Sequence, residues 1–578
     1  MKRWLKYIKP YWYYFALTPL FIMVEVIGEV IMPRQLATLI NSANAGTLTN
    51  AESMRVMLKM IITALCMMAG GILGTFTGTK AQVNFGADVR SDVFSKVQSF
   101  SFANVDKFST GSLVTRLTND ITRVQNFVGM VIRMALRAPG MMIAALIMAI
   151  SIRPSLSVVF LVSVPLLMLC ISKITRTAFP RFGITQSKVD KLNSTVQENV
   201  TNVRVVKSFV REKFSIEKFH DANGELKEAS LRAVRVIILM GPVMTFFMNA
   251  TIIAVILIGG PIVLNMDMAV GDLSAFITYV TQILMSLMAI NFILMMASRA
   301  IASGKRIVEV LDETPDISDS DAAYPEKQIE NGEIEFRNVN FRYYKNSEET
   351  VLNDVSLTIP AKTTVGIIGS TGSGKTTLVS MIPRLYDCDS GEVLVDGVNV
   401  KDYSLFNLRE GVGMVLQNNL LFSGTIADNL RWGDENATEE ELRAAAAAAQ
   451  ADGFVQSFTE GYETKIEQGG TNVSGGQKQR LCIARAMLKK PKILILDDST
   501  SAVDTATEAL IREAFANELK DSTKIIIAQR ISSVENADMI VVVNEGTITG
   551  IGSHDELLAS NEEYREIYES QSGIKKGA

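Results

Sequence analysis

The distribution of apolar residues divides the chain into two parts. Up to residue 301, six apolar stretches are each long enough for a helix that crosses a bilayer, which takes about 20 residues. These predicted spans are 11–32, 56–78, 131–152, 155–174, 237–264 and 272–301. Beyond residue 332, short strand-like apolar runs alternate with helical runs, which is typical of an α/β domain. The pattern predicts an all-α membrane domain of six long helices followed by an α/β domain.

Two charged segments lie between these spans, at 79–130 and 175–236, and both keep helical spacing. We expect them to continue the membrane helices into the cytoplasm. Four basic residues precede the first span: Lys2, Arg3, Lys6 and Lys9. This charge places the N-terminus in the cytoplasm. The apolar run behind it is too long for a secretory leader, and no small-residue cleavage site follows. The expected protein crosses a membrane several times; the resemblance to a known family given below implies the cytoplasmic membrane of a bacterium.

Composition sets the domain limits and excludes some functions. The residues from 312 to 332 are polar and acidic with two prolines, so we expect a membrane domain over 1–315, a linker over 316–332, an α/β domain over 333–572 and a tail over 573–578. The net charge of −4 shows no basic excess and does not suggest nucleic acid. The four cysteines are too far apart for a disulfide framework or a zinc site.

A glycine-rich loop is the first element that carries chemistry. It comprises Gly369, Ser370, Thr371, Gly372, Ser373, Gly374, Lys375, Thr376 and Thr377. A strand-like run precedes it and a helical run follows, which is the setting of a phosphate-binding loop. Its backbone N–H groups would wrap the triphosphate of ATP, Lys375 would reach the β- and γ-phosphates, and the Thr376 hydroxyl would bind Mg²⁺.

A second apolar strand, 493–497, ends in Asp497. A carboxylate at a rigid strand end supports the same Mg²⁺ ion. Between the two elements lies the signature segment, Ser474, Gly475, Gly476 and Gln477. With this segment the chain resembles an ATP-binding-cassette (ABC) exporter half-transporter, a membrane domain fused to one nucleotide-binding domain. The resemblance implies an ATPase coupled to transport, in which the signature of one chain contacts the ATP bound by another chain.

The same resemblance suggests further sites. Tyr343 matches the aromatic residue on which adenine stacks, with Tyr344 or a role in the sheet core as alternatives. Gln417 matches a glutamine that touches Mg²⁺ and faces the membrane domain. Residues 501–504 match a loop that crosses between two nucleotide-binding domains. Residues 111–120 match a first coupling segment, which would transmit the nucleotide state to the helices, and 203–212 match a second.

Two positions depart from the family pattern at the hydrolytic site. The family normally has Glu after Asp497 and His in the segment 525–530, but this chain has Asp498 and Gln529. Residues 467–470 also differ from the sequence typical of homodimeric exporters. Aspartate is one methylene shorter than glutamate, and glutamine carries no charge. The resemblance therefore implies the degenerate-site subunit of a heterodimeric multidrug exporter, in which Asp498, Gln529 and Gln417 form a slow hydrolytic site. A homodimer that tolerates both changes is the alternative.

Two carboxylates inside the first span, Glu25 and Glu29, lie on one helix face. Carboxylates at this depth usually face a cavity or a partner, so either a role with cationic substrates or polar pairing between helices is open. The expected function is ATP-driven export of amphipathic drugs or lipids together with a second half-transporter. A protein of a different functional class, either an ATP-gated channel or a regulatory membrane subunit, remains an alternative.

Overall fold

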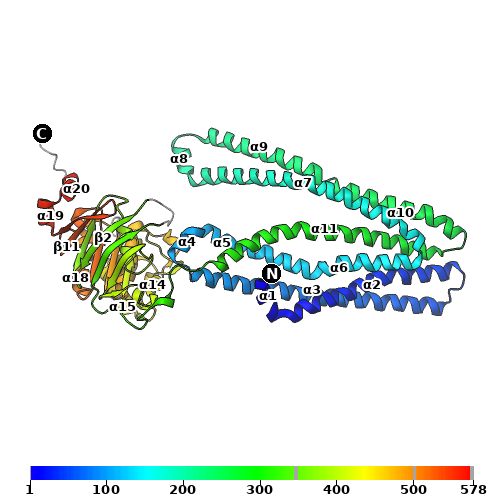
Figure 1. Ribbon diagram of the computed structural model, residues 1–578, viewed down its shortest axis with the longest axis horizontal. Coiled ribbons are helices and arrows are strands. Elements are labelled where there is room, and N and C mark those ends of the chain that lie inside the picture. The colour runs from blue at the N-terminus through cyan, green and yellow to red at the C-terminus, as the bar shows by residue number, and fades with distance from the viewer. Residues whose placement is uncertain (1, 344–348, 499–502, 573–578) are drawn as a thin grey trace. The chain divides into compact units, whose positions relative to one another are not determined.

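The computed structural model describes residues 2–343, 349–498 and 503–572, and the chain divides into two compact units (Figure 1). The first unit comprises Met1–Val97 and Gly111–Asp312. The second comprises Gln98–Thr110 and Glu313–Ala578. The predicted tail, 573–578, lies outside the described residues.

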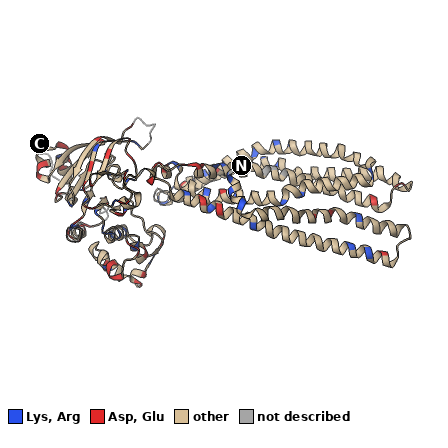
Figure 2. Ribbon diagram, turned by 60° about the horizontal axis from the view of Figure 1, so that its bottom comes forward, with Lys and Arg blue, Asp and Glu red and all other residues tan. Residues whose placement is uncertain are grey.

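The first unit is built from helices. They are α1 (Lys2–Ile8), α2 (Trp12–Asn44), α3 (Asn50–Gln98), α5 (Thr110–Thr115), α6 (Ile121–Ile152), α7 (Pro154–Thr201), α8 (Val203–Ser208), α9 (Glu212–Ile237), α10 (Met240–Leu264) and α11 (Val270–Asp312). Within the described residues, six helices are long and apolar enough to cross a membrane, which confirms the prediction of six spans. Lys, Arg, Asp and Glu are sparse along most of their length (Figure 2).

Small residues allow α2 and α3 to pack closely. A Cβ atom added at Gly70 of α3 would lie 2.8 Å from the carbonyl oxygen of Phe21 in α2. One turn further along, the buried hydroxyl of Thr18 donates a hydrogen bond of 2.8 Å to Thr77. Close backbone contact at small residues is the usual way in which helices associate within a membrane. The glycines of the second span therefore fix the position of α2, which carries Glu25 and Glu29.

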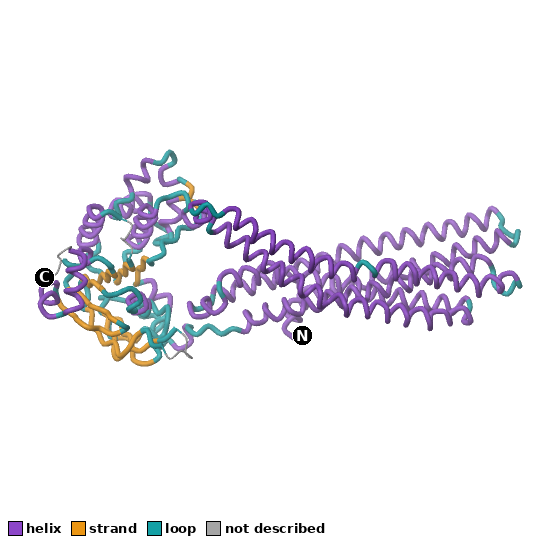
Figure 3. Tube along the Cα trace, turned by 90° about the horizontal axis from the view of Figure 1, so that it is seen from above, coloured by secondary structure: helices purple, strands orange, loops and turns teal. Residues whose placement is uncertain are grey.

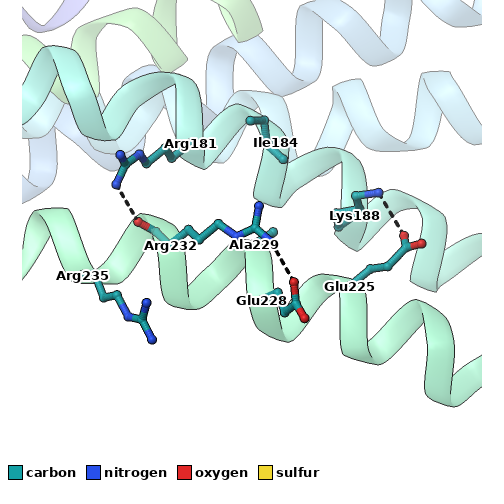
Figure 4. Close-up of a pocket in the computed structure, with 8 residues that line it drawn as sticks. All are labelled: Arg181, Ile184, Lys188, Glu225, Glu228, Ala229, Arg232 and Arg235. Atoms are coloured by element: carbon teal, nitrogen blue, oxygen red, sulfur yellow. Dashed lines mark hydrogen bonds and ion pairs between the residues drawn. The ribbon is translucent and has the colours of Figure 1, made fainter.

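The helices α7 and α9 run side by side beyond the apolar part of α7 (Figure 4). Lys188 and Glu225 form an ion pair of 2.9 Å, and Arg181 donates a hydrogen bond of 3.1 Å to the carbonyl oxygen of Arg232. Arg232 pairs in turn with Glu228 on its own helix at 2.7 Å. Exposed pairs of this kind each contribute less than about 1 kcal/mol, so they align the two helices more than they stabilise them.

A buried polar cluster joins the start of α6 to α11. Asp120, which is 0% exposed, ends a π-helical turn (Arg116–Asp120). Its carboxylate accepts a hydrogen bond of 2.7 Å from Nε of Arg306 and one of 2.8 Å from the hydroxyl of Ser303. Since a buried carboxylate is unfavourable without such partners, the cluster fixes α6 against α11.

The second unit contains two main sheets (Figure 3). The larger has the order β12-β11-β3-β10-β9-β6, in which every neighbouring pair is parallel except β11 and β12. Its strands are β3 (Thr364–Ile368), β6 (Val412–Val415), β9 (Ile493–Asp497), β10 (Thr523–Ile527), β11 (Met539–Asn544) and β12 (Thr547–Gly552). The smaller is antiparallel, with the order β2-β1-β4-β5, and consists of β1 (Ile334–Phe341), β2 (Leu352–Ile359), β4 (Ser390–Val395) and β5 (Val398–Asn399). A short pair, β7 (Gly424–Thr425) and β8 (Lys465–Ile466), stands apart.

The larger sheet is buried on both faces, which explains why its strands have continuous apolar sequences. In β9, Leu494 and Leu496 belong to one hydrophobic cluster, while Ile493 and Ile495 belong to another. The alternation follows from the two-residue period of a strand.

The helices of this unit are α12 (Lys375–Ser380), α13 (Leu405–Glu410), α14 (Ile426–Arg431), α15 (Glu439–Ala448), α16 (Asp452–Ser457), α17 (Gly475–Leu488), α18 (Thr505–Glu518), α19 (His554–Ser560) and α20 (Glu562–Ser572).

The short helix α4 (Phe102–Phe108) belongs to the second unit although it directly follows α3. The side chains of Ser101 and Asn104 form a capping box that starts it. The hydroxyl of Tyr386 donates to Asp106 at 3.0 Å, and Nδ2 of Asn104 donates to Glu313 at 3.1 Å. The predicted first coupling segment, 111–120, lies in the first unit, and its role in coupling stays a prediction.

Candidate nucleotide site

The glycine-rich loop connects β3 to α12, as its sequence predicts. A Cβ atom at Gly369 would lie 1.9 Å from the carbonyl oxygen of Val543 in β11, so this position admits no side chain. Gly372 and Gly374 have φ angles of +86° and +97°, a region that glycine occupies without strain. The loop therefore owes its shape to three glycines and to the neighbouring strand.

Lys375 lies over the loop. Its ammonium group donates to the carbonyl oxygens of Gly369 at 2.9 Å and Ser370 at 2.6 Å, and to the hydroxyl of Ser373 at 3.3 Å. Burial lowers the pKa of Lys375, while the charges of Asp497 and Asp498 oppose this shift. A lysine held in this way can donate to phosphate oxygens in exchange for the carbonyl groups.

The residues that would hold Mg²⁺ lie together at the end of β9. The hydroxyl of Thr376 donates to Oδ1 of Asp497 at 3.1 Å. Asp497 is 2% exposed, its Oδ2 atom has no hydrogen-bond partner, and burial raises the pKa of its carboxyl group. Among the described residues, no three His, Cys, Asp or Glu side chains form a metal cluster. A magnesium ion fits here only if nucleotide and water supply its remaining ligands, as Mg²⁺ sites usually require.

Tyr343 packs at the side of the loop. Its hydroxyl lies 2.8 Å from the Thr377 hydroxyl, and its ring makes edge contacts with Phe341 and Tyr386 at centroid distances of 5.0 and 5.2 Å. The side chain is 43% exposed, so part of the ring is available to a ligand. The alternative residue, Tyr344, lies outside the described residues.

The two unusual hydrolytic residues contact each other. Asp498 follows β9 and Gln529 follows β10, and these neighbouring parallel strands bring their carboxyl ends to one edge of the sheet. Nε2 of Gln529 donates a hydrogen bond of 2.8 Å to Oδ2 of Asp498. Burial raises the pKa of the Asp498 carboxyl group, and hydrogen bonds from Gln417 and Gln529 oppose this shift. The structure thus brings together the three predicted catalytic residues.

The signature segment begins α17. Ser474 is the N-cap of this helix, and its hydroxyl accepts the N–H of Gln477 at 3.3 Å. Oε1 of Gln477 accepts the N–H of Ser474 at 2.9 Å, which completes a capping box. Ser474 and Gly475 are exposed. Within the described contacts, nothing joins this segment to the glycine-rich loop of the same chain.

The predicted crossing loop is described only in part. Ser501 and Ala502 lie outside the described residues. Asp504 is the N-cap of α18, where its carboxylate accepts the N–H of Thr507 at 3.0 Å. Hydrogen bonds from the backbone N–H and from the hydroxyl of Thr507 lower the pKa of Asp504.

A second candidate site lies in the first unit, where an open cavity of about 620 Å³ is lined by α2, α3, α6 and α11. Glu25 and Glu29 both line it. The sequence analysis missed the basic residues opposite them, Arg133 and Arg137 of α6. Both arginines lie inside the third predicted span, four residues apart. Charged residues at this depth usually face a cavity or a partner, so their positions could have indicated the site.

The fold and the loop together define a class, a multi-pass membrane protein that carries a P-loop nucleotide-binding domain. The family pattern described as ABC transporter transmembrane region matches residues 15–287, and that described as ABC transporter matches residues 352–501. The uncharacterized ABC transporter ATP-binding protein YfiB of Bacillus subtilis is 36% identical over 99% of both chains. The fatty acid ABC transporter ATP-binding/permease protein of Mycobacterium bovis is 36% identical over 88% of this chain and 79% of its own length.

A structure of a bacterial Atm1-family ABC exporter with ATP bound has the same fold, with a TM-score of 0.79, 22% identity and coverage of 99% of both chains. The chain belongs to the ABC transporter family, with the membrane and ATP-binding parts fused. It is an ATPase coupled to transport, and its nucleotide-binding domain lies in the cytoplasm.

Proposed function

We propose that this chain is one half of a heterodimeric exporter of amphipathic compounds or lipids, and that its own nucleotide site holds Mg²⁺–ATP but hydrolyses it slowly. The observation that carries this proposal is the hydrogen bond between Asp498 and Gln529. It occupies the carboxylate that would polarise the attacking water.

Two chemical properties make this site slow. The Asp498 carboxylate is one methylene short of the family's glutamate, and an error of about 1 Å in placing a catalytic group can cost ~10²-fold in rate. Gln529 lacks the charge that a protonated histidine brings to the γ-phosphate, and its amide is already engaged. The loop, Lys375 and Asp497 retain their phosphate- and metal-binding groups. Binding is therefore preserved while hydrolysis is weakened.

The signature segment supports a role in the site of a partner chain. It stands at the N-terminus of a 14-residue helix, where backbone N–H groups and the helix dipole favour a phosphate group. The capping box of Ser474 and Gln477 holds this end of the helix in place. An intact signature beside weakened hydrolytic residues is expected when one of two composite sites is fast and the other slow.

Exposed apolar residues support an assembly of two chains. The predicted second coupling segment lies around α8, which has no buried residue, and the adjoining Phe209 and Val210 are 73% and 79% exposed. On the second unit, Phe422 and Trp432 stack at 4.3 Å and are exposed as well. Apolar groups gathered in this way mark interaction surfaces. We assign the tip around α8 to docking on the nucleotide-binding domain of the partner.

The proposed substrate class and the proposed direction of transport rest on similar proteins and on the cavity of the first unit. One relative is named for fatty acid transport, and the solved structure of the same fold is named an exporter. The cavity between α2, α6 and α11 combines charged and apolar residues, which suits an amphipathic compound. In sealed vesicles, uphill movement of substrate identifies a pump, whereas dissipative flux identifies an ATP-gated channel.

When this chain is purified without its partner, we expect either an unstable protein or ATP hydrolysis about 10²-fold slower than that of the co-expressed pair. The reason is that two copies of this chain form only slow sites. The measurement is steady-state ATPase of both preparations in the same lipid. A stable homodimer with ordinary turnover and transport would establish the homodimer alternative instead.

A further inference from the structure

We propose that the cavity of the first unit selects an amphiphile whose head group carries both a positive and a negative charge. This inference rests on the proposed export of amphipathic compounds and adds the chemistry of the head group. It is based on four charged side chains, two from α2 and two from α6, which line this cavity of about 620 Å³.

The two carboxylates share one cation. Arg137 forms ion pairs of 3.1 Å with Glu25 through Nη1 and of 3.1 Å with Glu29 through Nη2. A single guanidinium therefore balances two carboxylates, and one negative charge remains uncompensated at this side of the cavity. An ammonium group of a ligand would supply the missing positive charge, which is worth more here than in water because the site lies within the membrane domain.

Arg133 provides the opposite charge one turn away on α6. Its guanidinium donates to the backbone carbonyl of Gly129 at 3.2 Å and to Oε1 of Gln82 at 3.3 Å, both neutral acceptors. In the described part of the chain no carboxylate pairs with it. A phosphate or carboxylate of the ligand would satisfy this guanidinium, which is suited to bidentate contact with such groups.

The four charges sum to zero, and this balance determines which charges the ligand can carry. A purely cationic ligand would balance the carboxylates but leave Arg133 without a counter-ion. A purely anionic ligand would meet Arg133 but be repelled by Glu25 and Glu29. Only a ligand with both charges compensates both ends of the cavity.

The remaining walls suit the rest of such a molecule. Methionines supply an adaptable apolar surface for a hydrocarbon chain: Met130, Met134, Met141 and Met285. Gln282 of α11 donates to the carbonyl oxygen of Glu29 at 2.9 Å, while its Oε1 atom is buried without a partner. This free acceptor favours an ammonium group that retains N–H bonds, as in a phosphoethanolamine head group.

The test is direct binding to the co-purified pair in nanodiscs without ATP. The probes are lysophosphatidylethanolamine, which carries both charges, dodecyltrimethylammonium and dodecyl phosphate. We expect the first to bind about 10-fold more tightly than either singly charged probe. Arg133→Gln should remove this advantage, because an ionic hydrogen bond is lost, and should not weaken binding of dodecyltrimethylammonium, since a positive charge is removed from the cavity. The double change of Glu25 and Glu29 to Gln should weaken both lysophosphatidylethanolamine and the cation.

Arg133→Lys, which retains the charge, should keep part of the preference, and Arg176→Gln, an exposed residue of α7 outside the cavity, should have no effect. Retention of Mg²⁺–ATP shows that each variant is folded. Equal affinities for the three probes, or an unchanged preference in Arg133→Gln, would overturn this inference. Because the assay needs neither hydrolysis nor transport, that failure would leave the proposed exporter standing. Normal binding without uphill transport would instead refute the proposed function alone.

Discussion

Gly475→Asp in this chain should reduce ATP turnover of the co-purified pair by ~10²–10³-fold. Gly475 is the first residue of α17 and is exposed beside the N-cap Ser474. The new carboxylate would stand where backbone N–H groups meet the γ-phosphate bound by the partner. It would repel the phosphate charge and occupy the space of the phosphate at the proposed fast site.

The matched change is Asp498→Asn in the same chain. It removes the carboxylate from the proposed slow site, so turnover should fall less than about 3-fold, while ATP remains bound. The measurement is steady-state ATPase and transport of pairs that carry each change separately. If Asp498→Asn abolished turnover and Gly475→Asp were tolerated, the assignment of fast and slow sites would be reversed.

Gly369→Ala should abolish nucleotide binding by this chain. The added methyl carbon would lie 1.9 Å from the carbonyl oxygen of Val543, which belongs to β11, a strand paired with β12 and β3. The loop must shift away from the strand, and the N–H groups that would wrap the phosphates lose their positions. We expect ATP affinity at this site to fall by ~10²-fold or more.

Gly372→Ala provides the control for Gly369→Ala. No atom lies within 4 Å of the added Cβ, so this variant carries only the cost of a φ angle of +86°, roughly 1–2 kcal/mol. Equilibrium binding of a fluorescent ATP analogue to each variant measures the difference. Equal affinities of the two variants would show that the contact with Val543 does not shape the loop.

The sequence was sufficient for features set by local constraints. The length of an apolar stretch determines whether a helix can cross a membrane, so the six spans were predicted correctly. The positions of Gly369 and Gly374 between a strand and a helix likewise predicted the loop between β3 and α12. Each of these signals depends on residues that are close in the sequence.

Contacts between distant residues were not predictable in the same way. The pairing of Asp498 with Gln529 depends on β9 and β10 being neighbours, a matter of sheet order. Arg137 and Glu29 are separated by 108 positions, and only the packing of α6 against α2 brings them together. The sequence left open whether Glu25 and Glu29 meet a cationic substrate or pair with another helix, and the ion pairs with Arg137 of α6 are a pairing of the second kind.

The central claim is that this chain retains ATP while its partner hydrolyses it, and the nucleotide state of each chain tests this most directly. The co-purified pair is allowed to turn over a photoreactive ATP analogue that carries a label on either its α- or its γ-phosphate, and is then irradiated. The ratio of γ- to α-label attached to each chain gives the fraction that is still triphosphate. The account predicts a ratio near one on this chain and near zero on its partner. Equal loss of the γ-label from both chains would contradict it.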